Sequence, residues 1–254
     1  MHEILSRLPP TAWVLDLGAA GGSFAAAATQ ARVVRLDLEP RTENGFAADA
    51  SRLPFPAATF DAIIANHSLE HIDKLTEALR EIGRVLKPNG ALFVSVPDAS
   101  TLTDKIYRWL ARGGGHVNPF TDPVALARDI SSATGARFAG SRTLHSGLSF
   151  LNRGNFRARP PRRMLLFFGG REGFLRLFTL SLRMADRALG TRLSVYGWAL
   201  YFGPVEDIRT RALGNVCVRC GSSGAPLPHQ LTGRFPAPRW RCPDCGTENY
   251  FTED

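Results

Sequence analysis

The sequence predicts an α/β fold with a parallel sheet, followed near the C-terminus by a small cysteine-rich module. Three observations lead to this prediction. Short apolar runs alternate with helical stretches up to about residue 145, which is typical of parallel strands joined by crossover helices. A glycine-rich turn, GAAGG at residues 18–22, follows the first apolar run. The four cysteines form two Cys-x-x-Cys pairs, both after residue 216.

The first expected elements lead from the glycine-rich turn to a buried strand. Residues 12–18 (AWVLDLG) form a strand that ends at the turn, and the alanine-rich residues 24–31 form the helix after it. Residues 31–39 (ARVVRLDLE) form the second strand. The continuous apolar run of residues 60–66 (FDAIIAN) indicates a strand that is buried on both faces.

The later elements continue the same alternation. Over residues 74–86, apolar side chains recur at helical spacing, and Pro88-Asn89-Gly90 ends this helix. Residues 91–97 (ALFVSVP) form the next strand. The remaining expected elements are a helix over 123–135 and strands over 136–144 and 194–202.

The composition excludes two broad classes of protein. Of the 254 residues, 44% are hydrophobic, 9% aromatic and 21% charged, which is not the profile of a disordered chain. Outside the glycine-rich segment, the longest uncharged runs are residues 193–205 and 220–233, both too short to span about 30 Å of hydrocarbon. The start, MHEILSRLPP, lacks the basic head and apolar stretch of a signal peptide, so a cytoplasmic location is expected.

The connection 145–193 is unusually long and carries the net charge. Residues 151–192 hold ten arginines and two acidic residues, and this segment alone accounts for the formal net charge of +8. Such a concentration favours an anionic partner, although a solvated helix face is the alternative interpretation.

Part of this connection has the pattern of a basic amphipathic helix. The apolar face holds Phe174, Leu177, Phe178, Leu182, Ala185 and Leu189. The opposite face holds Arg176, Arg183 and Arg187. A helix of this kind lies on a membrane surface, on a partner or on its own domain, the last being commonest.

The cysteine pairs predict a metal site. Four thiolates, from Cys217, Cys220, Cys242 and Cys245, can surround one tetrahedral Zn²⁺ ion. Gly221 and Gly246 follow the two pairs, where a turn around the metal needs a positive φ. Two disulfides are the alternative, but a cytoplasmic chain disfavours them. A closed four-cysteine site leaves no open position on the metal, so a structural zinc ion is expected.

The first strand and its turn have features of an adenosine-binding site. Glycines at 18, 21 and 22 let the backbone approach a ligand closely. Asp16, at the end of the strand, suits a cationic ligand better than a pyrophosphate. Asp37 closes the second strand, where an acid can bind both ribose hydroxyls. Together these residues predict a ligand in which adenosine is attached to a positively charged group.

Four sequence blocks in this order resemble a known family. They are VLDLGAAGGSF, LDLE, AADASRLPFPAATFDAIIANHSLEHI and ALREIGRVLKPNGALFVSVPD. The chain resembles the class I S-adenosylmethionine-dependent methyltransferases, in the subgroup that acts on small molecules, over about residues 11–145 and the last strand. The one departure is Ala20, where the family usually has glycine.

The resemblance implies a Rossmann-like seven-stranded sheet, to which the long connection adds a helical insert before the last strand and the cysteine pairs add a zinc ribbon. A methyltransferase domain is expected over residues 1–205 and the ribbon over 212–254. The insert, residues 145–193, begins at the sheet edge where such enzymes bind the cofactor, and a lid over the substrate is expected.

The resemblance also implies which residues bind S-adenosylmethionine. Asp16, Gly18, Ala20 and Gly22 would line its methionine end, and Asp37 would hold the ribose diol. The contacts expected with the adenine come from the side chain of Asp49 and the backbone N–H of Ala50.

Catalytic residues are expected past the 60–66 strand. Asn66 and His67 would lie below the sulfonium and face the acceptor. His67 and His116 are the candidates for a general base, because an oxygen nucleophile often needs one and histidine titrates near neutral pH. For Glu70 and His71, orienting the local backbone is favoured over catalysis.

Three functions follow from this pattern. The leading one is methylation, expected on oxygen, of a small-molecule, glycan or lipid-linked acceptor, with residues 160–190 touching the inner membrane face. The second is methylation of RNA or a nucleoprotein, gripped by the arginines and the ribbon. It is disfavoured because the arginines alternate with Leu and Phe at helical spacing. The third is an inactive domain whose ribbon binds a protein partner, against which the intact cofactor blocks argue.

Overall fold

The computed structural model describes residues 1–110, 116–154, 170–205, 208 and 213–252. Contacts within the chain divide it into two compact units. Unit 1 comprises Met1–Pro97, His116–Arg142 and Trp198–Ala212. Unit 2 comprises Asp98–Gly115, Thr143–Gly197 and Leu213–Asp254, so the long connection and the cysteine pairs fall in the same unit.

Unit 1 is built on a parallel sheet, as the sequence predicts. Its strands are β1 (Trp13–Leu17), β2 (Arg32–Asp37), β3 (Gly45–Ala47), β4 (Phe60–Asn66) and β5 (Leu86–Pro97). They lie in the order β3-β2-β1-β4-β5, and each neighbouring pair is parallel. Their carboxyl ends therefore meet at one edge of the sheet.

Two further strands begin or end in unit 1 and continue into unit 2. These are β6 (Phe138–His145) and β7 (Val195–Phe202). The Gly203 N–H donates to the Arg137 carbonyl near one end of this pair, and the Ser146 N–H donates to the Ser194 carbonyl near the other. Hydrogen bonds in this arrangement make β6 and β7 antiparallel.

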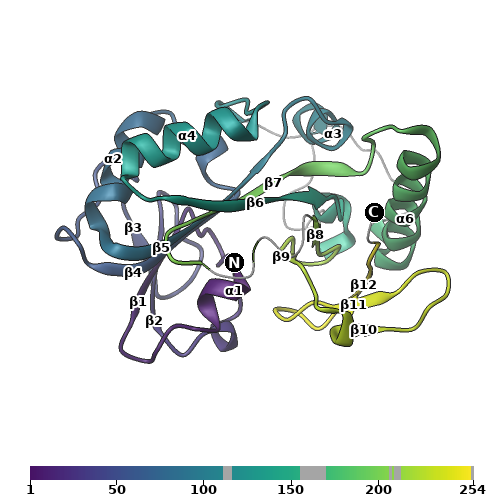
Figure 1. Ribbon diagram of the computed structural model, residues 1–254, viewed down its shortest axis with the longest axis horizontal. Helices are drawn as coiled ribbons and strands as arrows, with labels where there is room; N and C mark the ends of the chain where they lie inside the picture. Colours follow the sequence, from purple (N-terminus) through teal and green to yellow (C-terminus); the bar gives the residue numbers. More distant parts are fainter. Residues whose placement is uncertain (111–115, 155–169, 206–207, 209–212, 253–254) are drawn as a thin grey trace. The chain divides into compact units, whose positions relative to one another are not determined.

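Helices α2 (Leu75–Val85) and α4 (Pro123–Thr134) lie side by side on the sheet of unit 1 (Figure 1). Gly83 allows this close approach, because a Cβ at that position would lie 2.6 Å from the Cα of Thr134. Asp122 is the N-cap of α4, and its side chain accepts hydrogen bonds from the N–H groups of Val124 and Ala125. It ends at Gly135, whose φ is 72°.

The core of unit 1 comes from both helices and from the central strands. Its fully buried members include Leu15, Ile63, Ile82, Leu92 and Ile130. Phe60 and Phe202 are also fully buried in it. The continuous apolar runs of β1, β4 and β5 thus belong to strands that are covered on both faces.

Unit 2 contains the remaining helices and short strands. They are α3 (Leu102–Leu110), α6 (Glu172–Leu189), β8 (Leu213–Val216), β9 (Ser223–Gly224), β10 (Leu231–Thr232), β11 (Arg239–Arg241) and β12 (Glu248–Tyr250). Strand β8 pairs with β6 in parallel and with β9 in antiparallel orientation. Strands β10, β11 and β12 form a separate antiparallel sheet.

Unit 2 has an apolar cluster of its own. Leu110 from α3, Leu148 and Leu151, Leu175 from α6, and Val218 from the first cysteine pair are all at least 95% buried and in contact. The long connection and the cysteine module therefore share one core.

The short elements complete the described fold. They are α1 (His2–Leu5) and the 3-10 turns η1 (Ala26–Ala28), η2 (Leu69–His71), η3 (Ser149–Leu151) and η6 (Pro228–Gln230). The helix expected over 24–31 was wrong, because only η1 forms there.

Candidate functional site

The expected cofactor residues of the first two strands lie together at the carboxyl edge of the sheet in unit 1. Asp16 is the fourth residue of β1, and Asp37 is the last residue of β2. Strand pairing places Asp16 opposite Arg35 and Leu17 opposite Leu36, so Gly18 begins the turn beside Asp37. The N–H groups of Gly18 and Ala19 both donate to the Leu36 carbonyl and hold the turn against β2.

The backbone of the glycine-rich turn has a conformation that favours small residues. Gly18, Ala20 and Gly22 have φ values of 69°, 42° and 102°. A Cβ at Gly18 would lie 2.3 Å from the Cβ of Ser68, so glycine is required there. Ala20 adopts the left-handed region without being glycine, and its N–H donates to Asp37 Oδ2 at 2.8 Å. This bond ties the turn to the acid of the second strand.

Asp16 is buried beneath this turn. Its Oδ2 accepts the Ser23 N–H at 3.0 Å and lies 3.6 Å from Arg35 Nε. Burial raises the pKa of Asp16 above its ordinary value, while the bonds from Ser23 and the charge of Arg35 act in the opposite direction. The site thus has a buried acid that is stabilised by a cation.

Arg35 is a site residue that the sequence interpretation missed. Its guanidinium donates to the Phe24 carbonyl at 2.9 Å and lies 5.9 Å from the centre of the Phe24 ring. It also fills the space beside Gly22, where a Cβ would approach it to 3.1 Å. The available signal was strand register, since a parallel pairing of β1 and β2 sets Arg35 opposite Asp16.

Asp49 and Ala50 lie after β3. Asp49 is exposed, and its Oδ1 accepts the Ser51 N–H at 2.8 Å, which holds the pKa of Asp49 below its ordinary value. Ala50 is half-buried and packs against the core of unit 1. Strand pairing sets Ala47, the last residue of β3, opposite Asp37. The turn with Asp49 and Ala50 therefore begins beside the end of β2.

Asn66 and His67 lie at the end of β4. Asn66 Oδ1 accepts the Ser95 hydroxyl at 2.7 Å, and the His67 N–H donates to the Ser95 carbonyl at 3.0 Å. His67 has a φ of 54°, a strained conformation for a residue with a side chain. Burial, with His116 and His71 nearby, lowers the pKa of His67 to about 3. The His67 imidazole is therefore neutral at neutral pH and a weak base there.

A second histidine group lies next to His67. Glu70 and His71 belong to η2, and His116 comes from a distant segment of unit 1. One ligand atom from each of Glu70, His71 and His116 lies within 4.8 Å of the others. The sequence interpretation proposed His116 as a base, and the structure brings it beside Glu70 and His71.

The four cysteines of unit 2 gather at one point, as predicted. Their Sγ atoms lie within 4.8 Å of one another, with Cys217 and Cys245 3.6 Å apart and Cys220 and Cys242 also 3.6 Å apart. This is the donor set and the geometry that Zn²⁺ prefers.

The backbone around these cysteines forms two similar turns. The Gly221 N–H donates to the Cys217 carbonyl and the Gly246 N–H to the Cys242 carbonyl. The φ values of these glycines are 76° and 70°, so the predicted positive φ is confirmed. Asn249 Nδ2 donates to Cys217 Sγ at 3.4 Å and stabilises a thiolate there.

The amphipathic helix of the long connection packs differently from the prediction. It forms as α6, but its most buried residues are Leu175, Thr179, Leu180 and Arg183. Leu177 and Leu189, both on the predicted apolar face, are 54% and 73% exposed. The face of α6 that packs within unit 2 is therefore not the predicted apolar face.

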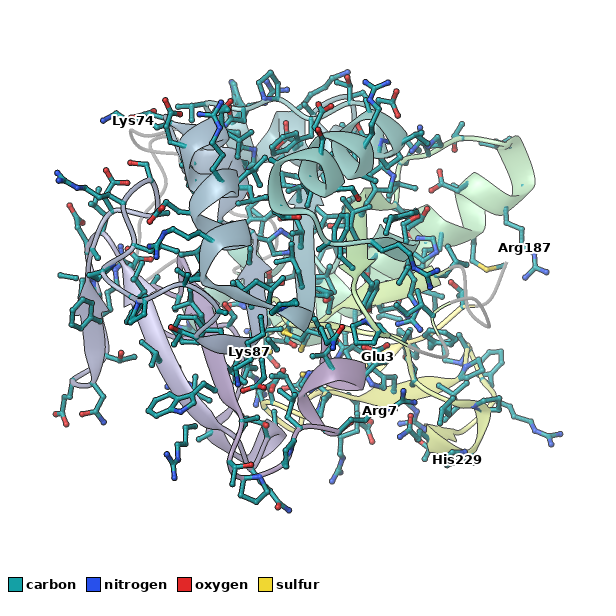
Figure 2. The ribbon with its side chains drawn as sticks, turned by 60° about the vertical axis from the view of Figure 1, so that its left-hand side comes forward. Glu3, Arg7, Lys74, Lys87, Arg187 and His229 are labelled. Atoms are coloured by element: carbon teal, nitrogen blue, oxygen red, sulfur yellow. The ribbon has the colours of Figure 1, made fainter. Side chains whose placement is uncertain are left out.

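The arginines explain this difference. Arg183 Nη1 donates to the Tyr250 carbonyl at 2.8 Å, and Arg176 Nη1 donates to the Glu248 carbonyl at 3.1 Å. Both carbonyls belong to β12, so these two arginines connect α6 to the cysteine module within unit 2. Arg187, by contrast, is exposed and extends outward from the helix (Figure 2).

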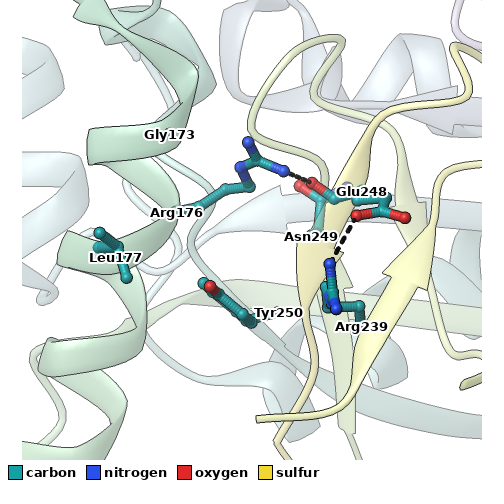
Figure 3. A pocket seen from close by; sticks show the side chains of 7 residues that line it. All are labelled: Gly173, Arg176, Leu177, Arg239, Glu248, Asn249 and Tyr250. Atoms are coloured by element: carbon teal, nitrogen blue, oxygen red, sulfur yellow. Dashed lines mark hydrogen bonds and ion pairs between the residues drawn. The ribbon is translucent and has the colours of Figure 1, made fainter. Parts of the chain in front are cut away.

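A cavity of about 370 Å³ lies between α6 and the β11–β12 pair (Figure 3). Its charged lining residues already pair with each other or with backbone: Arg176 binds the Glu248 carbonyl, and Arg239 lies 3.3 Å from the Glu248 carboxylate. The cavity is thus lined by contacts that stabilise unit 2. Four arginines of the connection, at 157, 159, 162 and 163, lie outside the described residues.

Comparison with known proteins identifies the family of the chain. A family model described as "Methyltransferase domain" matches residues 1–133. A ubiquinone biosynthesis O-methyltransferase of Xanthomonas axonopodis pv. citri is 31% identical over 159 residues, which cover 52% of this chain and 66% of the relative. A malonyl-[acyl-carrier protein] O-methyltransferase of Methylococcus capsulatus is 30% identical over 158 residues, which cover 55% of this chain and 58% of the relative. The chain spans less than two thirds of the length of these relatives.

Solved structures align with much of this chain at TM-scores below 0.5. The YcgJ protein of Bacillus subtilis has 18% identity and a TM-score of 0.48, over 77% of this chain and 92% of that one. A geranyl diphosphate C-methyltransferase of Streptomyces coelicolor A3(2) has 14% identity and a TM-score of 0.49, over 80% of this chain and 77% of that one.

Proposed function

The chain belongs to the S-adenosylmethionine-dependent methyltransferases, and from this premise we propose that it methylates an oxygen of a small-molecule, glycan or lipid-linked acceptor. The observation that carries the proposal is the convergence of Asp16, Gly18, Asp37 and His67 at one sheet edge of unit 1. The curated relatives named above are O-methyltransferases, which supports oxygen as the acceptor atom.

The residues at this edge fit the cofactor that the family implies. The turn from Gly18 to Gly22 has no large side chain that could block a ligand. Asp16 offers a buried carboxylate for a cationic amino group, and Asp37 ends β2, where a ribose diol is held in folds of this kind. We keep Ala20, Gly22, Asp49, Ala50 and Asn66 in the cofactor site as proposals. S-adenosylmethionine, when bound, supplies a methyl group made electrophilic by its positively charged sulfur.

The protein's own contribution is positioning and proton removal. Asn66, fixed by Ser95, and His67, held at a positive φ, line the edge where the acceptor approaches. Because a pKa of about 3 makes His67 a weak base at neutral pH, activation of the acceptor oxygen falls to His116 in this proposal.

For unit 2 we propose a structural zinc ion held by Cys217, Cys220, Cys242 and Cys245, since four thiolates leave the metal no open position. The domain limits 1–205 and 212–254, the role of 145–193 as a lid, and a cytoplasmic or peripheral membrane location stay predictions. Among the described residues, no helix is long and apolar enough to cross a membrane.

Methylation of RNA or a nucleoprotein is the second candidate, and one observation weakens it. Arg176 and Arg183 donate to carbonyls of β12, and Arg192 lies 3.3 Å from the carboxylate of Asp98. These three cations of the connection are therefore engaged within unit 2 and not offered to phosphates.

The test is transfer of radiolabelled methyl groups from S-adenosylmethionine by the purified chain into fractionated cell extract. Lipid, aqueous small-molecule and RNA fractions are counted separately, with Asp37→Ala as the inactive control. Label in the lipid or small-molecule fraction supports the proposal. Label confined to RNA overturns it in favour of the second candidate, and no label in any fraction overturns both.

A further inference from the structure

The group of Glu70, His71 and His116 combines the donors of a metal site. Two imidazoles and one carboxylate are a common ligand set for divalent transition metals, and one donor atom of each lies within 4.8 Å of the other two. The His71 and His116 rings are 5.0 Å apart between centroids, at 66°. Small side-chain rotations bring such atoms to the separation found around one ion.

Two backbone and two side-chain hydrogen bonds hold the segment after His116 next to Glu70 and His71. The N–H groups of Val117 and Asn118 both donate to the Glu70 carbonyl, at 2.8 and 3.1 Å. The Asn118 side chain donates to the Leu69 and Ile72 carbonyls, at 2.9 and 2.8 Å. Four bonds thus clamp the segment after His116 onto the turn that carries Glu70 and His71. The chain segment that follows His116 is therefore held against the turn with Glu70 and His71 by hydrogen bonds.

The three residues differ in burial, so an ion bound by them would be open to solvent on the His71 side and enclosed by protein on the Glu70 side. Glu70 is 1% exposed, His116 is half-buried and His71 is exposed. His67 Nδ1 lies 3.8 Å from Glu70 Oε1 on the buried side, where a neighbouring group can orient a ligating carboxylate.

We propose that Glu70, His71 and His116 bind one divalent transition metal ion of the zinc class, with positions left open for an oxygen of the acceptor. Three protein ligands are typical of catalytic zinc sites, and four of structural ones. The site therefore differs from the four-cysteine site of unit 2 in chemistry as well as in place. It lies next to His67, at the end of β4.

The proposed role of this ion, activation of the acceptor oxygen, rests on the proposed function. The binding of the ion by Glu70, His71 and His116 does not depend on that function. A metal-bound hydroxyl loses its proton to solvent at much lower pH than a free one. With its imidazole bound to the ion, His116 does not itself accept the proton, and the ion takes over the activation of the acceptor oxygen that the proposed function assigns to His116.

The test measures metal content of the full chain apart from activity. Purified protein is equilibrated with ZnCl₂, freed of unbound metal by gel filtration and analysed by mass spectrometry. The proposal expects two zinc ions per chain in the wild type and one in Glu70→Gln, His71→Ala and His116→Ala. His229→Ala, an exposed histidine of the cysteine module, is the control and keeps two. One zinc ion per chain in the wild type and the three variants alike overturns the proposal.

Cobalt(II) identifies which site an ion occupies. In protein whose cysteines are already loaded with zinc, added CoCl₂ should give weak visible bands without the strong near-ultraviolet absorption of thiolate ligands. His71→Gln and His116→Gln serve as second variants if an alanine variant does not fold, and they should lose these bands. Bands that persist in all variants overturn the proposal.

Failure of this inference is distinguishable from failure of the proposed function. A second metal ion without methyl transfer to any fraction leaves the metal site standing and removes the methylation proposal. Methyl transfer by protein that binds a single zinc ion removes the metal site and leaves the methylation proposal standing.

Discussion

At the scale of single residues, the cofactor turn combines one strained alanine with a buried acid. Ala20 has a φ of 42°, and its N–H is committed to Asp37. Asp16 beneath it is stabilised by Ser23 and Arg35. The turn is therefore held in a fixed conformation by side chains of the first two strands, because its own residues, glycine and alanine, have no polar side chains to hold it.

Replacing Ala20 with glycine should stabilise the protein. The left-handed region costs a residue with a side chain roughly 1–2 kcal/mol, and the extra freedom of glycine in the unfolded chain offsets about 0.5–1 kcal/mol of that. We expect the free energy of unfolding in urea to rise by up to about 1 kcal/mol. Ala19→Gly, at the adjacent buried position without a positive φ, should lower it. A less stable Ala20→Gly protein would contradict this account.

Replacing His116 with alanine should slow methyl transfer at least tenfold, because the acceptor oxygen loses the group that activates it. The affinity for S-adenosylmethionine, measured by calorimetry, should not change, since the expected cofactor contacts come from other residues. His229→Ala is the matched control. Unchanged turnover in His116→Ala would remove this residue from the mechanism.

At the scale of elements, α6 is held by its arginines as much as by its apolar residues. Arg183 is 6% exposed, and its guanidinium donates to a carbonyl of β12. Arginine has a long apolar stem, so it can lie in a buried face when its head finds acceptors there. Periodicity of apolar residues alone could not reveal these acceptors.

Arg183→Met should therefore destabilise unit 2. The variant keeps the apolar stem but leaves the Tyr250 carbonyl without its charged donor, at a cost of about 1–3 kcal/mol. Arg187→Met, on the exposed side of the same helix, should change stability by less than about 0.5 kcal/mol. Chemical unfolding of the full chain measures both. Equal effects of the two substitutions would show that α6 does not depend on this bond.

The end of α6 depends on a second polar group, Asp186. Its carboxylate accepts the Leu193 N–H, the Thr191 hydroxyl, and both the N–H and hydroxyl of Ser194, at 2.6–2.7 Å. Although partial burial acts in the opposite direction, these bonds lower the pKa of Asp186 overall. The folded state thus prefers the ionised carboxylate.

This preference gives a pH dependence of known sign. The stabilisation from Asp186 is complete above its ordinary pKa of 3.8 and is lost as the pH falls through the lower value of the folded state. We expect Asp186→Asn to lose about 1–2 kcal/mol of stability at pH 7. The gap to the wild type should narrow below pH 3.8. A gap that stays constant with pH would exclude this role for the carboxylate.

At the scale of the whole molecule, the sequence predicts the elements well and their long-range contacts poorly. The 60–66 strand agrees with β4 at both ends, because a strand buried on both faces is a continuous apolar run. Strand β3 and helix α3 were missed, and for β3 the reason is that three residues, Gly45–Ala47, are too few to give a periodicity. The cysteine cluster was predictable from spacing alone.

The candidate site was predictable only in part, because some of its residues are brought together by strand order and others by long-range hydrogen bonds. Asp16, Gly18 and Asp37 follow apolar strands, so their meeting at one edge is a consequence of parallel pairing. The approach of His116 to Glu70 depends on hydrogen bonds between segments that are far apart in the sequence. Local patterns contain no information about such bonds.

Removal of metal from the cysteines should loosen unit 2 beyond the cysteine module. Val218 lies between Cys217 and Cys220 and belongs to the same cluster as Leu110 and Leu175. After treatment with a chelator, hydrogen exchange measured by mass spectrometry should increase in α3 and α6 as well as in residues 213–252. Strands β1 and β4 should keep their protection. An increase confined to 213–252 would show that the cluster survives without the metal.

The shared cluster of unit 2 has a consequence for the synthesis of the protein. Leu110 leaves the ribosome long before Val218, and at roughly 5–20 residues per second the interval lasts about 5–20 s. During that time the apolar face of α3, and later that of α6, lacks the residue that completes its packing. A nascent chain of this protein therefore exposes apolar surface that chaperones can bind until residue 218 has been translated.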